Sequence, residues 1–104
     1  MEKYNIFEKI IVDKKEEIFF EIFKNETIKV EKIVSNGQKS PENFWYEQEK
    51  SEFVLVLEGF AILEFEDRVV ELKKGDCLNI GVMEKHRLKF TSLDEPTVWF
   101  AVFY

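Results

Sequence analysis

The sequence has few of the residues that support covalent cross-links, metal centres or membrane insertion. Its 104 residues include one cysteine, one histidine, two prolines and four glycines. A single cysteine, Cys77, excludes an internal disulfide, and its strand-like context GDCLNI predicts a buried apolar thiol. No apolar run approaches the roughly 18 residues of a membrane-spanning helix, and the N-terminus lacks the apolar segment of a signal peptide. We therefore expect a cytoplasmic protein with no membrane partner.

Basic residues are in the minority and are not clustered. The net charge is −6, and acidic and basic side chains are interspersed along the chain. Binding to a nucleic-acid backbone requires a basic patch or stripe, so the pattern argues against a nucleic-acid partner. The two short charge clusters, residues 14–17 and Lys73-Lys74, are interpreted as solvated turns.

The chain is rich in aromatic and β-branched residues. Hydrophobic residues make up 45% of the sequence, and eleven of them are phenylalanine. The length suits one domain, residues 1–104, with a single core. Residues 61–66 alternate between apolar and polar, and His86, Leu88 and Phe90 are expected to share one inward face of a strand. Eight to ten short strands separated by turns predict an all-β sandwich or barrel.

The sequence of the N-terminal third is consistent with more than one secondary structure. Residues 1–15 form either an arm or a strand. Residues 16–24 show the spacing of a helix, with a possible capping box at Asp13 and Glu16, but they also alternate as a strand would. We favour a strand that pairs with residues 27–35 across a turn at Asn25-Glu26.

Two later segments are apolar at nearly every position. Residues 35–43 are predicted as a loop, with a new strand starting at Phe44–Tyr46. The runs Phe53–Leu57 and Val98–Tyr104 resemble strands that are covered on both faces. A second copy of the chain is the simplest outer cover, which predicts a homodimer. The N-terminal arm is the alternative cover.

The spacing of four residues resembles the two sequence motifs of the cupin superfamily. Glu52 is followed by six residues and Gly59, and His86 stands eleven positions after Gly75, which opens a Gly-Asp pair. The resemblance extends over residues 37–90 and is greatest to small, single-domain bacterial cupins of the conserved-barrel type. It implies a double-stranded β-helix, a jelly-roll barrel of two facing antiparallel sheets.

The resemblance also implies where a site should lie. Cupins usually hold a divalent metal through two histidines and the glutamate of the first motif and the histidine of the second. The corresponding positions here are Tyr46, Gln48, Glu52 and His86. Gln48, Glu52 and His86 are therefore candidate ligands for Mn, Fe, Ni or Zn. The metal-free alternative is a polar network in which Glu52 and His86 form a charge-assisted hydrogen bond, with Gln48 and Tyr46 completing it.

Three functions are consistent with these residues. The first is a small-molecule-binding cupin whose ligand contacts Tyr46, Gln48, Glu52 and His86. The second is a metal-dependent enzyme, such as a sugar isomerase, epimerase or oxygenase, for which His86 and Glu52 are the candidate catalytic residues. The third is an interaction module whose barrel is filled by side chains. Trp45, Tyr46, Trp99 and the phenylalanines either line an apolar ligand cavity or form ordinary core.

Overall fold

All regular secondary structure in the chain is β-strand, and the chain contains no helix. A computed structural model describes all 104 residues. The eight strands are β1 (Ile18–Lys24), β2 (Lys29–Ser35), β3 (Glu52–Glu58), β4 (Phe60–Phe65), β5 (Val69–Lys73), β6 (Cys77–Ile80), β7 (His86–Thr91) and β8 (Thr97–Phe103). None of these elements is a helix that could span a bilayer.

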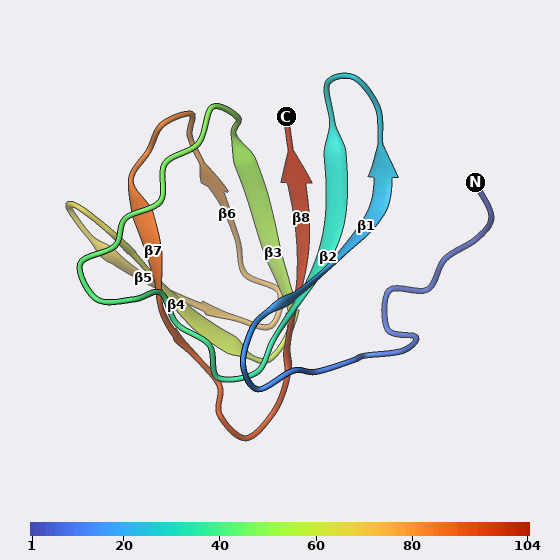
Figure 1. Cartoon of the computed structure of the whole chain (residues 1–104), viewed down its shortest axis with the longest axis horizontal. Helices are drawn as coiled ribbons and strands as arrows, with labels where there is room; N and C mark the ends of the chain where they lie inside the picture. The colour runs from blue at the N-terminus through green and yellow to red at the C-terminus, as the bar shows by residue number, and fades with distance from the viewer.

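The strands form two facing antiparallel sheets. The larger sheet has the order β1-β2-β8-β3-β6, and the smaller has the order β5-β4-β7. Figure 1 shows the two sheets diverging toward the end at which the chain terminates. Ten buried side chains lie between them as the core: Ile33, Val54, Val56, Ala61, Leu63, Phe65, Leu72, Ile80, Trp99 and Ala101. The predicted jelly-roll architecture is therefore confirmed.

Gly59 forms the corner at which the chain passes from one sheet to the other. It is the only residue between β3 and β4, and its φ is +93°. A Cβ atom at this position would lie 2.6 Å from the Cα of Thr97. The corner therefore requires a residue that has neither a side chain nor a steric penalty at positive φ.

The ambiguous N-terminal third is resolved as a hairpin. β1 pairs antiparallel with β2, and β2 continues the sheet onto β8. The side chain of Asn25 accepts hydrogen bonds from the backbone of Thr27 and Ile28, which fixes the turn. The favoured strand reading is confirmed. The helical spacing of residues 16–24 does not decide the structure, because pairing with β2 satisfies the backbone of this segment.

Two strand predictions were wrong in detail. Phe44–Tyr46 does not start a strand, because Asn43 has a φ of +63° and Phe44 closes a turn onto the carbonyl of Pro41. Only an isolated bridge forms, between Tyr46 and His86. Phe90 does not face inward, because β7 contains one extra residue opposite the Ile62–Leu63 step of β4. This bulge reverses the alternation, so that Phe90 lies outside.

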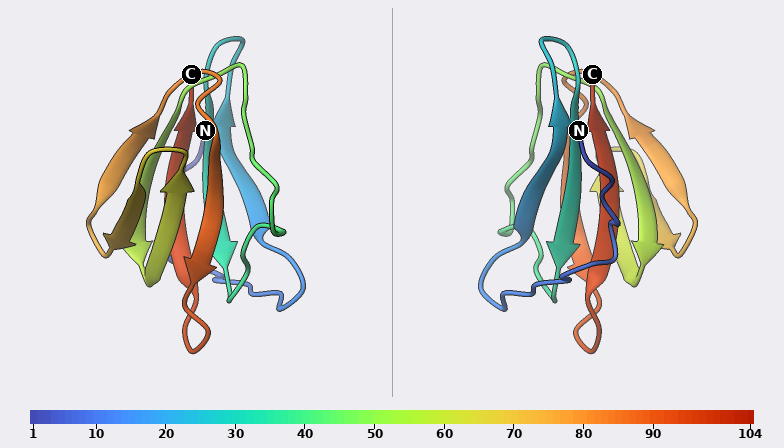
Figure 2. Two further views of the ribbon diagram at one scale, coloured as in Figure 1. Left: turned by 90° about the vertical axis from the view of Figure 1, so that its left-hand side faces the viewer. Right: turned by 90° about the vertical axis from the view of Figure 1, so that its right-hand side faces the viewer.

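The N-terminal arm covers part of the outer face of the larger sheet. The ring of Tyr4 stacks on that of Phe20, at a centroid distance of 5.3 Å. The ammonium of Lys32 donates to the carbonyls of Ile6 and Glu8. The right-hand view of Figure 2 shows the arm crossing this face. The arm therefore supplies cover over β1 and β2.

The remainder of the outer face is only partly covered. Phe53 and Leu55 on β3 and Phe100 on β8 are half-buried. Cys77 is exposed, so the prediction of a buried thiol was wrong. The alternation of β6 directs Leu78 and Ile80 toward the core and turns Cys77 outward.

Candidate functional site

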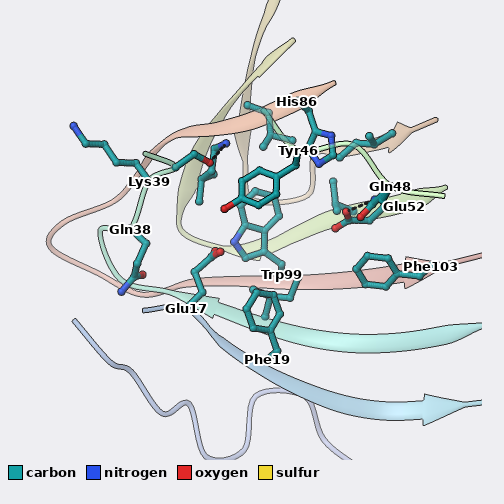
Figure 3. Close-up of a pocket in the computed structure, with 16 residues that line it drawn as sticks. Glu17, Phe19, Gln38, Lys39, Tyr46, Gln48, Glu52, His86, Trp99 and Phe103 are labelled. Carbon is teal, nitrogen blue, oxygen red and sulfur yellow. Dashed lines mark hydrogen bonds between the residues drawn. The ribbon is translucent and has the colours of Figure 1, made fainter. Parts of the chain in front are cut away.

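A cavity of about 290 Å³ lies between the two sheets. Its walls come from the segment that precedes β1, from strands of both sheets, and from the loop between β2 and β3 (Figure 3). The four residues selected from the sequence, Tyr46, Gln48, Glu52 and His86, all line this cavity. The structure therefore brings the whole predicted set together.

The loop between β2 and β3 is attached to β7 and forms a wall of the barrel. The backbone N–H of Ser40 donates to the carbonyl of Leu88 at 2.7 Å, and its hydroxyl accepts from the N–H of Leu88 at 2.9 Å. Tyr46 and His86 exchange two backbone hydrogen bonds of 2.8 and 3.0 Å. These bonds place Tyr46 beside His86, 40 positions later in the chain.

Glu52 begins β3, and its carboxylate lies in the cavity wall. The amide N–H of Gln48 donates to Oε1 of Glu52 at 3.0 Å. Burial raises the pKa of Glu52 above its usual value, while the bond from Gln48 and the nearby His86 oppose that rise. The carboxyl group therefore holds a proton more readily than it would in water.

His86 is buried, with 8% of its surface exposed. Its Nδ1 lies 2.9 Å from the carbonyl oxygen of Glu84, so Nδ1 carries the proton of that hydrogen bond. Nε2 takes part in no hydrogen bond within the protein. The predicted direct hydrogen bond between Glu52 and His86 is not formed, because Glu52 bonds to Gln48 and His86 bonds to the backbone.

A second carboxylate, that of Glu17, also lines the cavity, although no sequence motif includes it. The indole N–H of Trp99 donates to the hydroxyl of Ser35 at 3.0 Å, and this hydroxyl donates to the carboxylate of Glu17. Burial raises the pKa of Glu17, with a further rise from the charge of Glu52. Glu17 was assigned to a solvated turn because of its charged neighbours. Glu17 lies two positions before Phe19, so both side chains point to the same face of an extended segment, and Phe19 also lines the cavity. This spacing was the only sequence signal that could have identified Glu17.

The aromatic residues divide into two groups. Phe19, Tyr46, Trp99 and Phe103 line the cavity. Trp45 does not; its ring lies 5.9 Å from the guanidinium of Arg87. The ligand-cavity reading therefore describes Tyr46 and Trp99 but not Trp45.

The donor set around Glu52 does not fit a resident divalent metal. The structure contains no group of three His, Cys, Asp or Glu side chains that could share an ion. Gln48 directs its N–H rather than its carbonyl oxygen at Glu52. One imidazole and one carboxylate form a weak set, since transition metals prefer more nitrogen or sulfur ligands.

The comparisons with known proteins agree with this architecture. The family model described as Cupin domain matches residues 31–103. A crystal structure from Ralstonia eutropha JMP134, of a protein whose proposed activity is that of a mannose-6-phosphate isomerase, is 36% identical with a TM-score of 0.93, and the alignment covers 99% of this chain and 97% of that one.

More distant structures share the fold. An RmlC-like cupin from Desulfovibrio desulfuricans is 19% identical with a TM-score of 0.77, and the protein TT1209 from Thermus thermophilus is 15% identical with a TM-score of 0.82. Each alignment covers 99% of this chain and 96% of the other. No curated protein is significantly similar to the chain. Together, the family match and the Ralstonia structure show that this chain belongs to the cupin family.

Proposed function

We propose that this cupin binds a small organic molecule in the cavity between its sheets. The supporting observation is the cavity itself, which has a volume of about 290 Å³ and is lined by both apolar and polar side chains. Small-molecule sites have this composition and start at about 300 Å³. A void of this size argues against a barrel filled by its own side chains. Tyr46, Gln48, Glu52 and His86 would supply polar contacts to the ligand.

Binding can be tested by NMR with ¹⁵N-labelled protein and pools of small metabolites. We expect a true ligand to shift the indole N–H signal of Trp99, because this group lies in the cavity wall. Leu88→Trp should fill the cavity and abolish the shifts. Leu93→Trp is the matched control, since Leu93 is 76% exposed and lies outside the cavity. Shifts that persist in Leu88→Trp, or a complete absence of shifts, would contradict the proposal.

A second candidate is an isomerase that works by proton transfer. Its support is the 36% identity to the Ralstonia protein. Aldose–ketose isomerisation needs a base that removes a proton from the carbon next to the carbonyl and returns it to the neighbouring carbon. A carboxyl group of raised pKa, such as that of Glu52, suits this exchange, and His86 is a second candidate. Formation of fructose 6-phosphate from mannose 6-phosphate, lost in Glu52→Gln, would support this candidate; no formation would exclude this substrate.

We also propose a cytoplasmic homodimer without a nucleic-acid partner. The support for association is the apolar face formed by Phe53, Leu55 and Phe100, which remains half-buried in the single chain. The single free cysteine and the lack of a basic stripe support the location and the absence of a nucleic-acid partner. A mass measurement in solution tests the association.

A further inference from the structure

Three groups in the cavity wall, the carboxylates of Glu17 and Glu52 and the imidazole of His86, have atoms without a hydrogen-bond partner in the protein. Oε2 of Glu17 accepts from Ser35, and Oε1 of Glu52 accepts from Gln48. The other oxygen of each carboxylate has no donor within the protein. In a neutral imidazole whose Nδ1 proton is donated to Glu84, Nε2 of His86 is a further acceptor. These unmatched acceptors favour a ligand that donates hydrogen bonds.

The charge of the cavity is negative. Glu17 and Glu52 line it, and Lys39 is the only lysine or arginine in its wall. Lys39 is exposed, and Figure 3 shows its ammonium directed away from Glu17 and Trp99. Glu31 also lies near Glu52, but its ion pair with Lys29 offsets that charge. A bound cation would therefore meet attraction, and a bound anion would meet repulsion.

Aromatic rings surround these carboxylates. Phe19, Trp99 and Tyr46 lie around Glu17 in Figure 3, and Phe103 lies on the side of Glu52. The faces of aromatic rings carry partial negative charge and attract ammonium groups, most strongly where water is excluded. The same rings provide apolar contact for the body of a ligand.

We propose that the ligand is a small organic amine in its protonated form, with its ammonium between Glu17 and Glu52 and its apolar body against the aromatic walls. The inference rests on the proposed function, because it assigns a ligand class to the same cavity. A neutral polyol would satisfy the acceptors but would gain neither charge attraction nor a cation–π contact with the rings. A sugar phosphate would place an anion beside two carboxylates.

Three probes that share one body and differ in charge test the ligand class. Benzylamine, benzyl alcohol and benzoate have similar size, and their dissociation constants can be measured from the indole N–H signal of Trp99. We expect the amine to bind at least tenfold more tightly than the alcohol, and benzoate to bind more weakly than both. Equal binding of amine and alcohol, or tighter binding of benzoate, would overturn the inference.

Variants connect the preference to the two carboxylates. Glu17→Gln and Glu52→Gln keep the size of each side chain, and each should weaken amine binding about tenfold while changing alcohol binding by less than twofold. Glu21→Gln is the control, because Glu21 is exposed on β1 and does not line the cavity. Unchanged amine affinity in both cavity variants would contradict the proposed position of the ammonium.

The number of protons released when a ligand binds can be measured on the wild-type protein. This test does not depend on whether the variants fold. Burial raises the pKa of Glu17 and Glu52, so a cation bound between them should displace protons. The other titratable groups that face the cavity are His86, Tyr46 and Lys39. At pH 5, where a carboxyl group with a pKa above 4.5 is partly protonated, calorimetry in two buffers of different ionisation enthalpy should show proton release with benzylamine and not with benzyl alcohol. Proton uptake, or no proton release, on amine binding would overturn the inference.

The outcomes distinguish this inference from the proposed function. If benzyl alcohol, benzoate or mannose 6-phosphate binds in the cavity and benzylamine does not, the ligand class is wrong while small-molecule binding stands. If none of these probes binds and the metabolite pools also cause no shift, both proposals fail.

Discussion

Replacing Gly59 by alanine tests how closely the two sheets approach at the β3–β4 corner. The added Cβ would lie 2.5 Å from Oγ1 of Thr97, 2.6 Å from its Cα and 2.8 Å from the carbonyl oxygen of Pro96. Two of these three atoms belong to the backbone, so rotation of a side chain cannot relieve the contacts. The hydroxyl of Thr97 is also fixed, because it accepts a hydrogen bond from the N–H of Phe60 and donates one to the carbonyl oxygen of Phe60. The start of β8 must therefore move.

Two effects contribute to the expected magnitude. Alanine at a φ of +93° costs roughly 1–2 kcal/mol in backbone strain. Overpacking against fixed neighbours costs about 1–3 kcal/mol more. Gly59→Ala should therefore lower the free energy of unfolding by about 2–5 kcal/mol, a large share of the 5–15 kcal/mol typical of a domain.

Gly75→Ala provides the matched control. Gly75 has a φ of +90°, and an added Cβ there would meet no atom within 4 Å. This variant should lose only the strain, about 1–2 kcal/mol. Urea unfolding followed by tryptophan fluorescence measures both losses. A difference of less than about 0.5 kcal/mol between the two variants would refute the reasoning that close backbone approach selects glycine at position 59.

Three further predictions concern the cavity and the outer face. Because the folded pKa of Glu52 is raised, the stability that this carboxyl contributes is complete below the ordinary value of 4.5 and is lost as the pH rises through the folded pKa. Glu52→Gln should therefore unfold at a higher temperature than wild type at pH 8 and at the same temperature as wild type at pH 4. A difference in unfolding temperature that does not depend on pH would contradict this prediction. Ser35→Ala removes a buried hydrogen-bonding hydroxyl and should lower the free energy of unfolding in urea by about 1–3 kcal/mol. The control is Ser51→Ala, which removes a hydroxyl that makes no hydrogen bond and should lower this free energy by less than about 0.5 kcal/mol. Equal losses in the two variants would count against the role of Ser35. Light scattering should give about twice the monomer mass of 12.5 kDa, reduced to the monomer by Leu55→Asp; a monomeric wild type would refute the homodimer.

The sequence predicted most of the fold correctly. The alternation at Ala61, Leu63 and Phe65 gave the inward face of β4, and all three residues are buried. The alternation predicted the wrong face for Phe90, because a bulge depends on how two strands align and cannot be recognised from the sequence of the strand that contains it. It also failed for Cys77, which lies on an edge strand and faces outward.

The sequence predicted only some of the residues of the candidate site. The resemblance to the cupin motifs identified Tyr46, Gln48, Glu52 and His86, and the structure places all four around one cavity. The same motifs could not identify Glu17, which lies 35 positions before Glu52 and has charged neighbours. Nor could they show that Glu52 and His86 each bond to other groups.

The sequence by itself determined the strands from β3 to β8, most of their turns and the glycine corner, because these depend on the local alternation of apolar residues and on backbone geometry. Only the tertiary structure decided which charges are buried. Glu17 and Glu16 are adjacent and chemically identical, yet only Glu17 meets Ser35 and the cavity, because the strand that follows it pairs with β2 in one register. Burial depends on that long-range pairing, and so do the raised pKa values and the acceptor-rich cavity that carry the functional proposals.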